Sequence, residues 1–146
     1  MALRTQIEIN APVDRVWAVM SALPQWGTFN SFLKVVHAPD KIAPGQTLKV
    51  AFQPPGSSQP TLMAPQVVDW QEGRELRWRG KLWNTNLLFV GEHYFRLESV
   101  GPNKTVLHHG EDFKGCLVPL LGGLLKDTEK GFLDFNHGLK KAAEAP

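Results

Sequence analysis

The chain has 146 residues, 42% of them hydrophobic and 21% charged, and its formal net charge is +2. This length predicts one domain over residues 1–146, large enough to bury a substantial core. So small a net charge, with no run of basic residues, argues against a nucleic-acid-binding protein. No apolar run reaches the roughly 18–20 residues that span a membrane, so no stable membrane insertion is expected. The single cysteine cannot form an internal disulfide, which favours a cytoplasmic protein.

The first third of the chain predicts one strand followed by two short helices. Residues 5–9 alternate polar and apolar side chains, as a half-buried strand does. After Pro12, apolar residues recur at helical spacing, at Val13, Val16, Trp17 and Met20. Aromatic residues then recur every third position, at Trp26, Phe29 and Phe32, which predicts a second short helical segment.

The middle of the chain predicts strands separated by turns. They are expected at residues 33–37, 47–52, 62–70, 75–82, 89–97 and 105–113. Pro65 predicts a bulge or a sheet edge within its strand, because proline cannot donate a backbone hydrogen bond. The residues Gly101, Pro102 and Asn103 predict a turn between the last two strands.

These last two strands carry ionisable residues on the face that should be apolar. Strand alternation places His93 with Phe89, Phe95 and Leu97, and it places His109 and Glu111 with Leu107 and Phe113. In an antiparallel hairpin His93 falls opposite either His109 or Glu111. Since a buried polar group is costly without a partner or water, this cluster predicts a cavity with a polar end.

The end of the chain predicts a long amphipathic helix. Its buried stripe is expected to comprise Leu121, Leu124, Leu125, Thr128, Phe132, Phe135, Asn136 and Leu139. The predicted fold class is therefore α+β. A curved antiparallel sheet of about seven strands wraps around the C-terminal helix, and the two short helices follow the first strand.

Residues 115–125 approach this helix as an apolar segment interrupted by Pro119, Gly122 and Gly123. One interpretation is a loop and a buried helix start. The other is a gate over the cavity, with the two glycines allowing it to move. Cys116 is expected to be a small buried hydrophobe rather than a nucleophile.

Five segments resemble the START-like or SRPBCC superfamily, and its polyketide cyclase/dehydrase and lipid-transport branch in particular. Residues 7–17 are similar to that family's opening strand and helix. Residues 23–32 resemble its W-x-x-W-N-P-F pattern, with Phe29 in place of the second aromatic residue and Ser31 in place of the proline. Residues 75–80, 91–95 and 109–113 carry the rest of the resemblance, which covers essentially the whole chain. It implies a helix-grip fold, and family members include carriers, receptors, cyclases and oxygenase ligand domains.

The polar cluster has several interpretations. His93, His109 and Glu111 could form a purely structural network, contact a ligand, or transfer protons as catalytic residues. The candidate ligand-binding residues are Trp17, Trp26, Phe29, Trp78, Phe89, His93, Phe95, His109, Glu111, Phe113, Phe132 and Phe135. No nucleophile, phosphate-binding loop or cofactor motif is recognised, so neither a cofactor nor a metal is expected.

The leading hypothesis is a protein that binds a small hydrophobic or amphipathic ligand, of lipid, polyketide or aromatic type, for transport or sensing. One alternative is a cofactor-independent cyclase or dehydratase that uses a His–Glu pair for proton transfer. A further alternative is a protein-interaction module with a filled interior. The sequence does not name the ligand or decide between carrier, sensor and enzyme. It also leaves the oligomeric state open, because an exposed edge strand could pair with a second copy to form a dimer.

Overall fold

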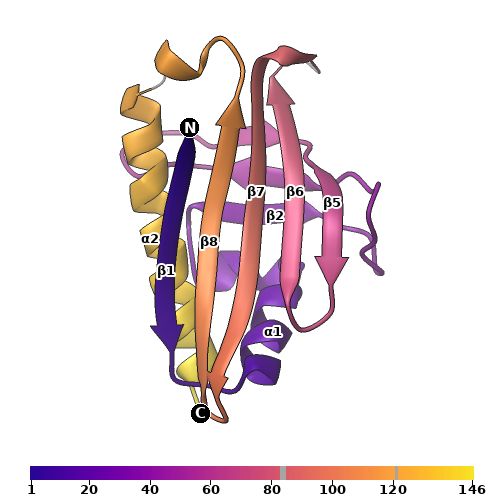
Figure 1. Ribbon diagram of the computed structural model, residues 1–146, viewed down its shortest axis with the longest axis vertical. Coiled ribbons are helices and arrows are strands. Elements are labelled where there is room, and N and C mark those ends of the chain that lie inside the picture. The colour runs from indigo at the N-terminus through magenta and orange to yellow at the C-terminus, as the bar shows by residue number, and fades with distance from the viewer. Residues whose placement is uncertain (83–84, 121) are drawn as a thin grey trace.

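The computed structural model describes residues 1–82, 85–120 and 122–146. Eight strands and two α-helices account for most of the described chain (Figure 1). In chain order they are β1 (Ala2–Ile9), α1 (Val13–Ser21), β2 (Leu33–His37), β3 (Lys49–Phe52), β4 (Thr61–Met63), β5 (Gln66–Gln71), β6 (Glu75–Leu82), β7 (Thr85–Gly101), β8 (Lys104–Lys114) and α2 (Gly122–Glu144). Two short 3-10 helices add Leu23–Thr28 and Val118–Leu120.

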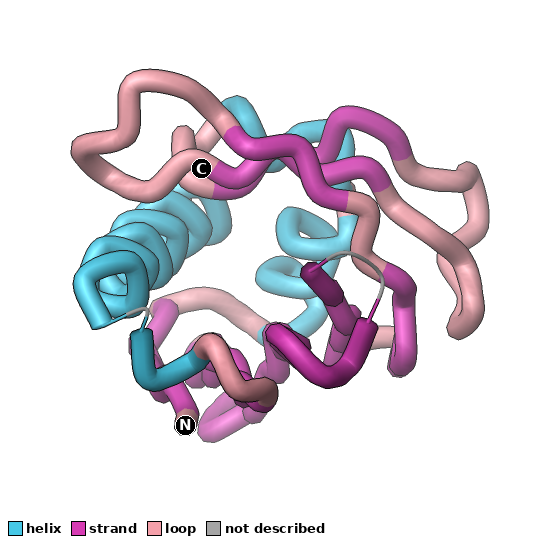
Figure 2. The backbone as a smooth tube through the Cα atoms, turned by 90° about the horizontal axis from the view of Figure 1, so that it is seen from above, coloured by secondary structure: helices cyan, strands magenta, loops and turns pink. Residues whose placement is uncertain are grey.

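The strands form two antiparallel sheets. The larger sheet has five strands in the order β1-β8-β7-β6-β5, and the smaller has three in the order β2-β3-β4. In Figure 1 the smaller sheet lies behind the larger, and its strands run across those of the larger one. Seen from above, the two sheets lie on opposite sides of the molecule with α2 beside them (Figure 2). The expected α+β class and helix-grip arrangement are confirmed.

The number and division of the strands differ from the sequence prediction, which gave about seven strands in one sheet. The expected strand over residues 62–70 is two strands, because the chain leaves the smaller sheet after Met63 and enters the larger one at Gln66. Pro65 lies at this crossing, and its carbonyl accepts a hydrogen bond from the Leu48 amide at 2.9 Å. The proline therefore marks a change of sheet rather than a bulge within one strand.

The second short helical segment is fixed by Asn30, whose side chain makes four backbone hydrogen bonds. Its amide nitrogen donates to the carbonyls of Trp26 and Leu33, and its oxygen accepts from the amides of Phe32 and Leu33. The indole of Trp26 donates to the Met20 carbonyl at 2.8 Å. The motif that resembled the family pattern thus holds the chain between α1 and β2 against the core.

The long helix α2 covers the inner side of the five-stranded sheet, as its apolar stripe predicts. Leu125, Thr128, Phe132, Phe135, Asn136 and Leu139 are buried as expected. Leu124 is 44% exposed and departs from the prediction, whereas Leu121 lies outside the described residues. Cys116 is also exposed, contrary to expectation, because the segment that follows β8 runs over the end of the molecule.

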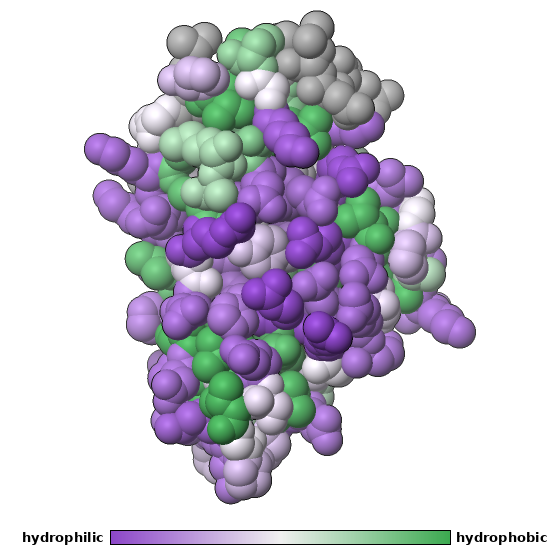
Figure 3. All heavy atoms as spheres, in the orientation of Figure 1, coloured by the Kyte–Doolittle hydropathy of each residue, from purple (hydrophilic) through white to green (hydrophobic). Residues whose placement is uncertain are grey.

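Polar side chains dominate the middle of the outer face of the five-stranded sheet (Figure 3). Arg77 and Arg79 both bond to Glu92, and Arg4 bonds to Asp112. Tyr94 lies beneath this layer with three guanidinium groups within 6 Å of its ring. This face is therefore a solvated ion-pair surface.

Candidate functional site

A cavity of about 280 Å³ lies between the two sheets and the N-terminal part of α2. The larger sheet contributes Trp78, Gly80, Lys81, Phe89, His93, Glu111 and Phe113; the smaller sheet contributes Leu33, Val50, Phe52, Thr61 and Met63; and α2 contributes Leu124, Leu125 and Thr128. Most of these side chains are apolar, and the exposed ones, Thr61, Lys81 and Leu124, mark the side that faces solvent.

The hollow exists because two glycines face each other on neighbouring strands. Gly80 of β6 pairs with Gly91 of β7, and strand alternation places both on the inner face. At Gly80 an added Cβ would meet only the terminal methyl of Met63, at 3.5 Å. At Gly91 a Cβ would overlap the carboxyl group of Glu111, which lies in the space that the missing side chain leaves. The two glycines therefore provide both the open volume and the place for the carboxyl.

Glu111 and His93 form the polar end of this cavity. They are directly paired across β7 and β8, which is one of the two registers expected from the sequence. Their closest atoms, His93 Nδ1 and Glu111 Oε1, are 3.5 Å apart, longer than an ordinary hydrogen bond. The side chain of His93 is 5% exposed and that of Glu111 is 13% exposed. The carboxyl is therefore reached from the cavity but largely removed from bulk solvent.

Behind His93 a chain of short hydrogen bonds runs into the core. His93 Nε2 lies 2.7 Å from His109 Nε2, and His109 Nδ1 lies 2.7 Å from the side-chain oxygen of Asn136. The amide nitrogen of Asn136 donates to the Thr5 hydroxyl at 2.9 Å, and that hydroxyl donates to the His109 carbonyl at 2.7 Å. Elements at both ends of the chain, β1 and α2, thus hold the hairpin histidines in place.

Aromatic rings surround the two imidazoles and exclude solvent from them. His109 stacks on Phe132 with ring centres 4.1 Å apart and planes 7° apart, and His93 stacks on Phe95 at 4.5 Å. Burial lowers the pKa of His109 to about 3, although its hydrogen bond to Asn136 opposes the shift. Burial, with a smaller effect of the neighbouring His109, also lowers the pKa of His93 well below its usual range. Both rings are therefore neutral near pH 7.

The pKa of the Glu111 carboxyl is shifted in the opposite direction, upward. Burial is the main cause, the nearby Asp112 charge adds to it, and the two raise the pKa of Glu111 to about 8. A carboxyl with this pKa is largely protonated at neutral pH. The polar end of the cavity is therefore uncharged at neutral pH, although it is formed by two ionisable side chains, Glu111 and His93.

The structure brings five of the residues predicted as ligand contacts to the cavity wall, namely Trp78, Phe89, His93, Glu111 and Phe113. The other seven lie elsewhere. Trp26, Phe95, Phe132, Phe135 and His109 fill the centre of the interior; Phe29 packs on Phe135; and Trp17 packs on Trp70 and bonds to Glu72. The aromatic cluster is thus divided between a packed centre and a hollow end.

Sequence reasoning did not single out Asn136, Thr5 or Gly80 as part of the site. Asn136 was recognisable as a polar residue on an apolar helical stripe, and Gly80 as a glycine on the inner face of its strand. Their partners were not recognisable, because the contacts join β1, β6 and α2 to the hairpin across long stretches of sequence. Leu124 and Leu125, from the segment predicted as a possible gate, do line the cavity.

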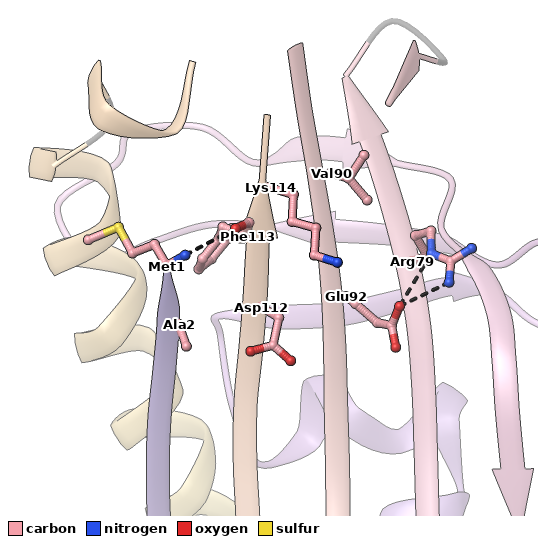
Figure 4. A pocket seen from close by; sticks show the side chains of 8 residues that line it. All are labelled: Met1, Ala2, Arg79, Val90, Glu92, Asp112, Phe113 and Lys114. Atoms are coloured by element: carbon pink, nitrogen blue, oxygen red, sulfur yellow. Dashed lines mark hydrogen bonds and ion pairs between the residues drawn. The ribbon is translucent and has the colours of Figure 1, made fainter. Parts of the chain in front are cut away.

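A second hollow lies on the outer face of the large sheet (Figure 4). Its walls include the Arg79–Glu92 ion pair, Asp112 and Lys114, and the Met1 amino group donates to the Phe113 carbonyl beside it. This hollow faces away from His93 and belongs to the ion-pair surface. We therefore place the candidate site in the inner cavity.

Two further observations concern the described residues only. Within these ranges, no three His, Cys, Asp or Glu side chains are grouped in a way that could hold a metal ion. No helix there combines the length and apolarity that crossing a membrane requires.

A five-stranded sheet and a smaller sheet around a C-terminal helix, with a cavity between them, define a helix-grip protein of the START-like class. The chain belongs to the polyketide cyclase / dehydrase and lipid transport family, whose model matches residues 2–144. No curated protein sequence matches the chain.

Solved structures share the fold at low sequence identity. The Zhui aromatase/cyclase from Streptomyces sp. R1128 is 14% identical, with a TM-score of 0.75 over 99% of this chain and 93% of its own. A START superfamily protein from Mycobacterium smegmatis is 15% identical, with a TM-score of 0.68 over 96% of this chain and 97% of its own. The di-domain aromatase/cyclase BexL has a TM-score of 0.68 at 12% identity and is covered over 50% of its length. At these identities the likeness concerns the fold alone.

Proposed function

We propose that the protein binds a small, mostly apolar molecule with one polar group in the cavity between the two sheets, for transport or sensing. The observation that carries this proposal is a hollow lined by Trp78, Phe89, Phe113 and aliphatic side chains, with Glu111 and His93 together at one end. An apolar wall with a few convergent polar groups is the usual design of a small-molecule site.

The volume limits the ligand. At about 280 Å³ the cavity lies at the lower end of the range for small-molecule pockets, which is roughly 300–1,000 Å³. Among the described residues of α2, those that line the cavity end at Thr128, before the packed centre of the interior where Trp26 contacts Trp78 and Phe135. The proposed ligand is therefore a compact body such as a fused pair of aromatic rings, or the end of a longer molecule.

One observation favours a cyclase or dehydratase as a second candidate. Glu111 has a pKa of about 8 and lines the cavity, so it could donate a proton to a bound substrate near neutral pH. The histidines are less suited to accept one, because burial lowers both of their pKa values. A protein-interaction module with a filled interior receives the least support, since the hollow end is not filled.

Filling the cavity tests the proposal. Gly80→Val would place two methyl groups in the hollow, where only Met63 is near. The expected result is that naphthalene-type probes, followed by calorimetry or fluorescence, bind the native protein and lose at least tenfold in affinity for the variant. Native mass spectrometry of freshly purified protein should also show a retained small molecule that the variant lacks.

Gly101→Val is the matched control. Gly101 lies at the exposed end of β7, and the nearest atom to an added Cβ is 3.8 Å away on Lys104. This variant should bind the probes as the native protein does. Equal probe binding by native protein and Gly80→Val would contradict the proposed site, and turnover of a bound substrate that is lost in Glu111→Gln would favour the enzyme.

A further inference from the structure

The hydrogen-bond chain behind the cavity has a fixed direction, which is set at its far end. A carbonyl oxygen can only accept, so the Thr5 hydroxyl, 2.7 Å from the His109 carbonyl, must donate to it. The Thr5 oxygen then accepts from Asn136, which identifies the Asn136 atom at 2.9 Å as its amide nitrogen. The amide oxygen consequently faces His109 Nδ1 at 2.7 Å. The orientation of Asn136 thus follows from its partners.

The protons of both histidines are fixed by their partners in the same way. Because the Asn136 oxygen only accepts, His109 Nδ1 carries a proton, and a neutral His109 then has a bare Nε2. His93 Nε2, 2.7 Å away, must donate to that nitrogen. A neutral His93 therefore turns a bare Nδ1, which can only accept, toward Glu111. Each group donates to the next, from the cavity inward to the backbone.

The charged groups around Glu111 agree with a proton on its carboxyl. From β7 it faces His93, which is neutral, and α2 contributes Thr128, whose hydroxyl donates to the Leu124 carbonyl. Lys81 of β6 is the one Lys or Arg among the described residues that line the cavity, and it is exposed. Asp112, the next residue along β8, is on the outer face and bonds to Arg4. Among the described residues, no Lys or Arg forms an ion pair with the Glu111 carboxyl group.

From this geometry we infer that the inner end of the cavity is an uncharged donor–acceptor pair that selects a neutral hydroxyl group on the ligand and disfavours a carboxylate. His93 Nδ1 is the acceptor and the protonated Glu111 is the donor. Their 3.5 Å separation lets one hydroxyl oxygen lie within hydrogen-bond distance of both, donating to the first and accepting from the second. A carboxylate has no proton to give His93, and its charge would be buried without a counter-ion. This inference rests on the proposed binding function and names the class of ligand.

Histidine tautomers test the pair without any ligand. In ¹⁵N NMR spectra of the native protein at about pH 7, His93 should be neutral with its proton on Nε2, and His109 neutral with its proton on Nδ1. A proton on His93 Nδ1, or a charged His93, would overturn the inference because the cavity would then face a donor beside a carboxylate.

Three probes of similar size test the selectivity: naphthylmethanol, methylnaphthalene and naphthoate. At about pH 7 the native protein should bind the alcohol roughly threefold to tenfold more tightly than the hydrocarbon, as one net hydrogen bond predicts. It should bind naphthoate at least tenfold more weakly than the alcohol.

Equal affinity for alcohol and hydrocarbon would refute the selectivity and leave the binding function intact. Failure of all three probes to bind would count against the binding function, while the tautomers would still decide the nature of the pair.

Glu111→Gln separates a neutral pair from an ionised one. The amide of glutamine can donate to the ligand hydroxyl as the protonated carboxyl does, so the preference for the alcohol at pH 7 should change by less than about threefold. Above pH 8 the preference of the native protein should change, because the ionised Glu111 no longer donates to the ligand hydroxyl and can only accept from it, whereas the preference of the variant should stay as it is at pH 7. Glu98→Gln, which removes a carboxylate beside His108 on the outer face, is the matched control and should follow the native protein. A large loss in Glu111→Gln at pH 7 would show that the carboxylate, not the acid, is the binding form.

Discussion

The interior has a packed centre and a hollow end, and glycines occupy key positions in both. In the centre, Gly131 of α2 lies against the ring of Phe32, and Gly138 lies against the Phe29 backbone, so neighbouring groups occupy the missing side-chain volume. At the end, Gly80 and Gly91 face each other, and the space beside them holds one carboxyl group and the cavity. A glycine in a core thus means close packing or open volume, depending on what faces it.

The largest effect should come from removing an aromatic ring in the packed centre. Phe135 is completely buried and contacts Trp26, Phe95 and His109, so Phe135→Ala should lower the free energy of unfolding by about 3–5 kcal/mol. Phe89→Ala, at the half-buried wall of the cavity, should cost less than about 2 kcal/mol. Urea unfolding of both variants measures the difference. Equal losses would show that the two regions are packed alike.

A smaller loss is expected from breaking the hydrogen-bond chain. Asn136→Leu conserves volume but leaves the proton on His109 Nδ1 without an acceptor, which should cost about 1–3 kcal/mol. Thr128→Val is the control on the same helix, because the Thr128 hydroxyl donates to the Leu124 carbonyl one turn away and takes no part in the chain of hydrogen bonds through the histidines. We expect that control to lose under about 1 kcal/mol. If urea unfolding gave similar losses for the two variants, Asn136 would have no special role in fixing the histidines.

The dependence of stability on pH should have a maximum near pH 6.5. Below this value the unfolded histidines bind protons that the folded ones, with lowered pKa values, do not, so stability falls as pH falls. The Glu111 carboxyl has the opposite effect on the pH dependence of stability. Its folded pKa of about 8 exceeds the usual 4.5, so its stabilising contribution is complete below about pH 4.5 and is lost as pH rises through 8.

Thermal unfolding across this pH range provides the measurement. Glu111→Gln should remove the decline above pH 6.5 and be more stable than the native protein at pH 9. The expected gain is about 1–2 kcal/mol, since the carboxyl is 13% exposed and its shift is partly relieved by solvent. A variant that declines in parallel with the native protein would show that Glu111 is ionised in the fold at neutral pH.

The smallest effect is expected at Gly80, and Gly131 provides the comparison. Gly80→Ala adds one methyl group to open volume and restricts the unfolded chain, so it should raise the free energy of unfolding by about 0.5–1 kcal/mol. Gly131→Ala places the same group against Phe32 and should lower it by about 1–3 kcal/mol. Opposite signs in denaturant unfolding would sharpen the contrast between the two regions, and a loss at Gly80 would contradict it.

The sequence predicted the parts of the site that depend on local geometry. The period of two in the last two strands and the turn at residues 101–103 were enough to bring His93 and Glu111 to one inner face. The helical spacing of the apolar residues between 121 and 139 then predicted the helix that covers them. The change of sheet at Pro65 was not predicted, because a proline between two apolar runs is equally compatible with an edge strand.

The rest depended on contacts that local patterns do not contain. Which aromatic side chains fill the centre and which line the hollow is decided by where α2 and the smaller sheet lie on the large one. Trp26 and Trp78 have the same character in the sequence, yet only Trp78 reaches the cavity. Likewise, the pairing of Gly80 with Gly91 requires the register between β6 and β7.

The two-residue turn at Pro102 and Asn103 has a consequence for the order in which the molecule assembles. The hairpin of β7 and β8 closes over a few residues, whereas the Thr5 hydroxyl must find the His109 carbonyl across 104 positions in the chain. Contacts between distant segments form slowly relative to local ones. Until β1 pairs with β8 and α2 packs on the inner face of the sheet, the histidines are in contact with water and titrate near pH 6.5. We therefore expect refolding to slow in mildly acidic solution, because both imidazoles must release a proton before α2, whose Phe132 ring stacks on His109, can cover them.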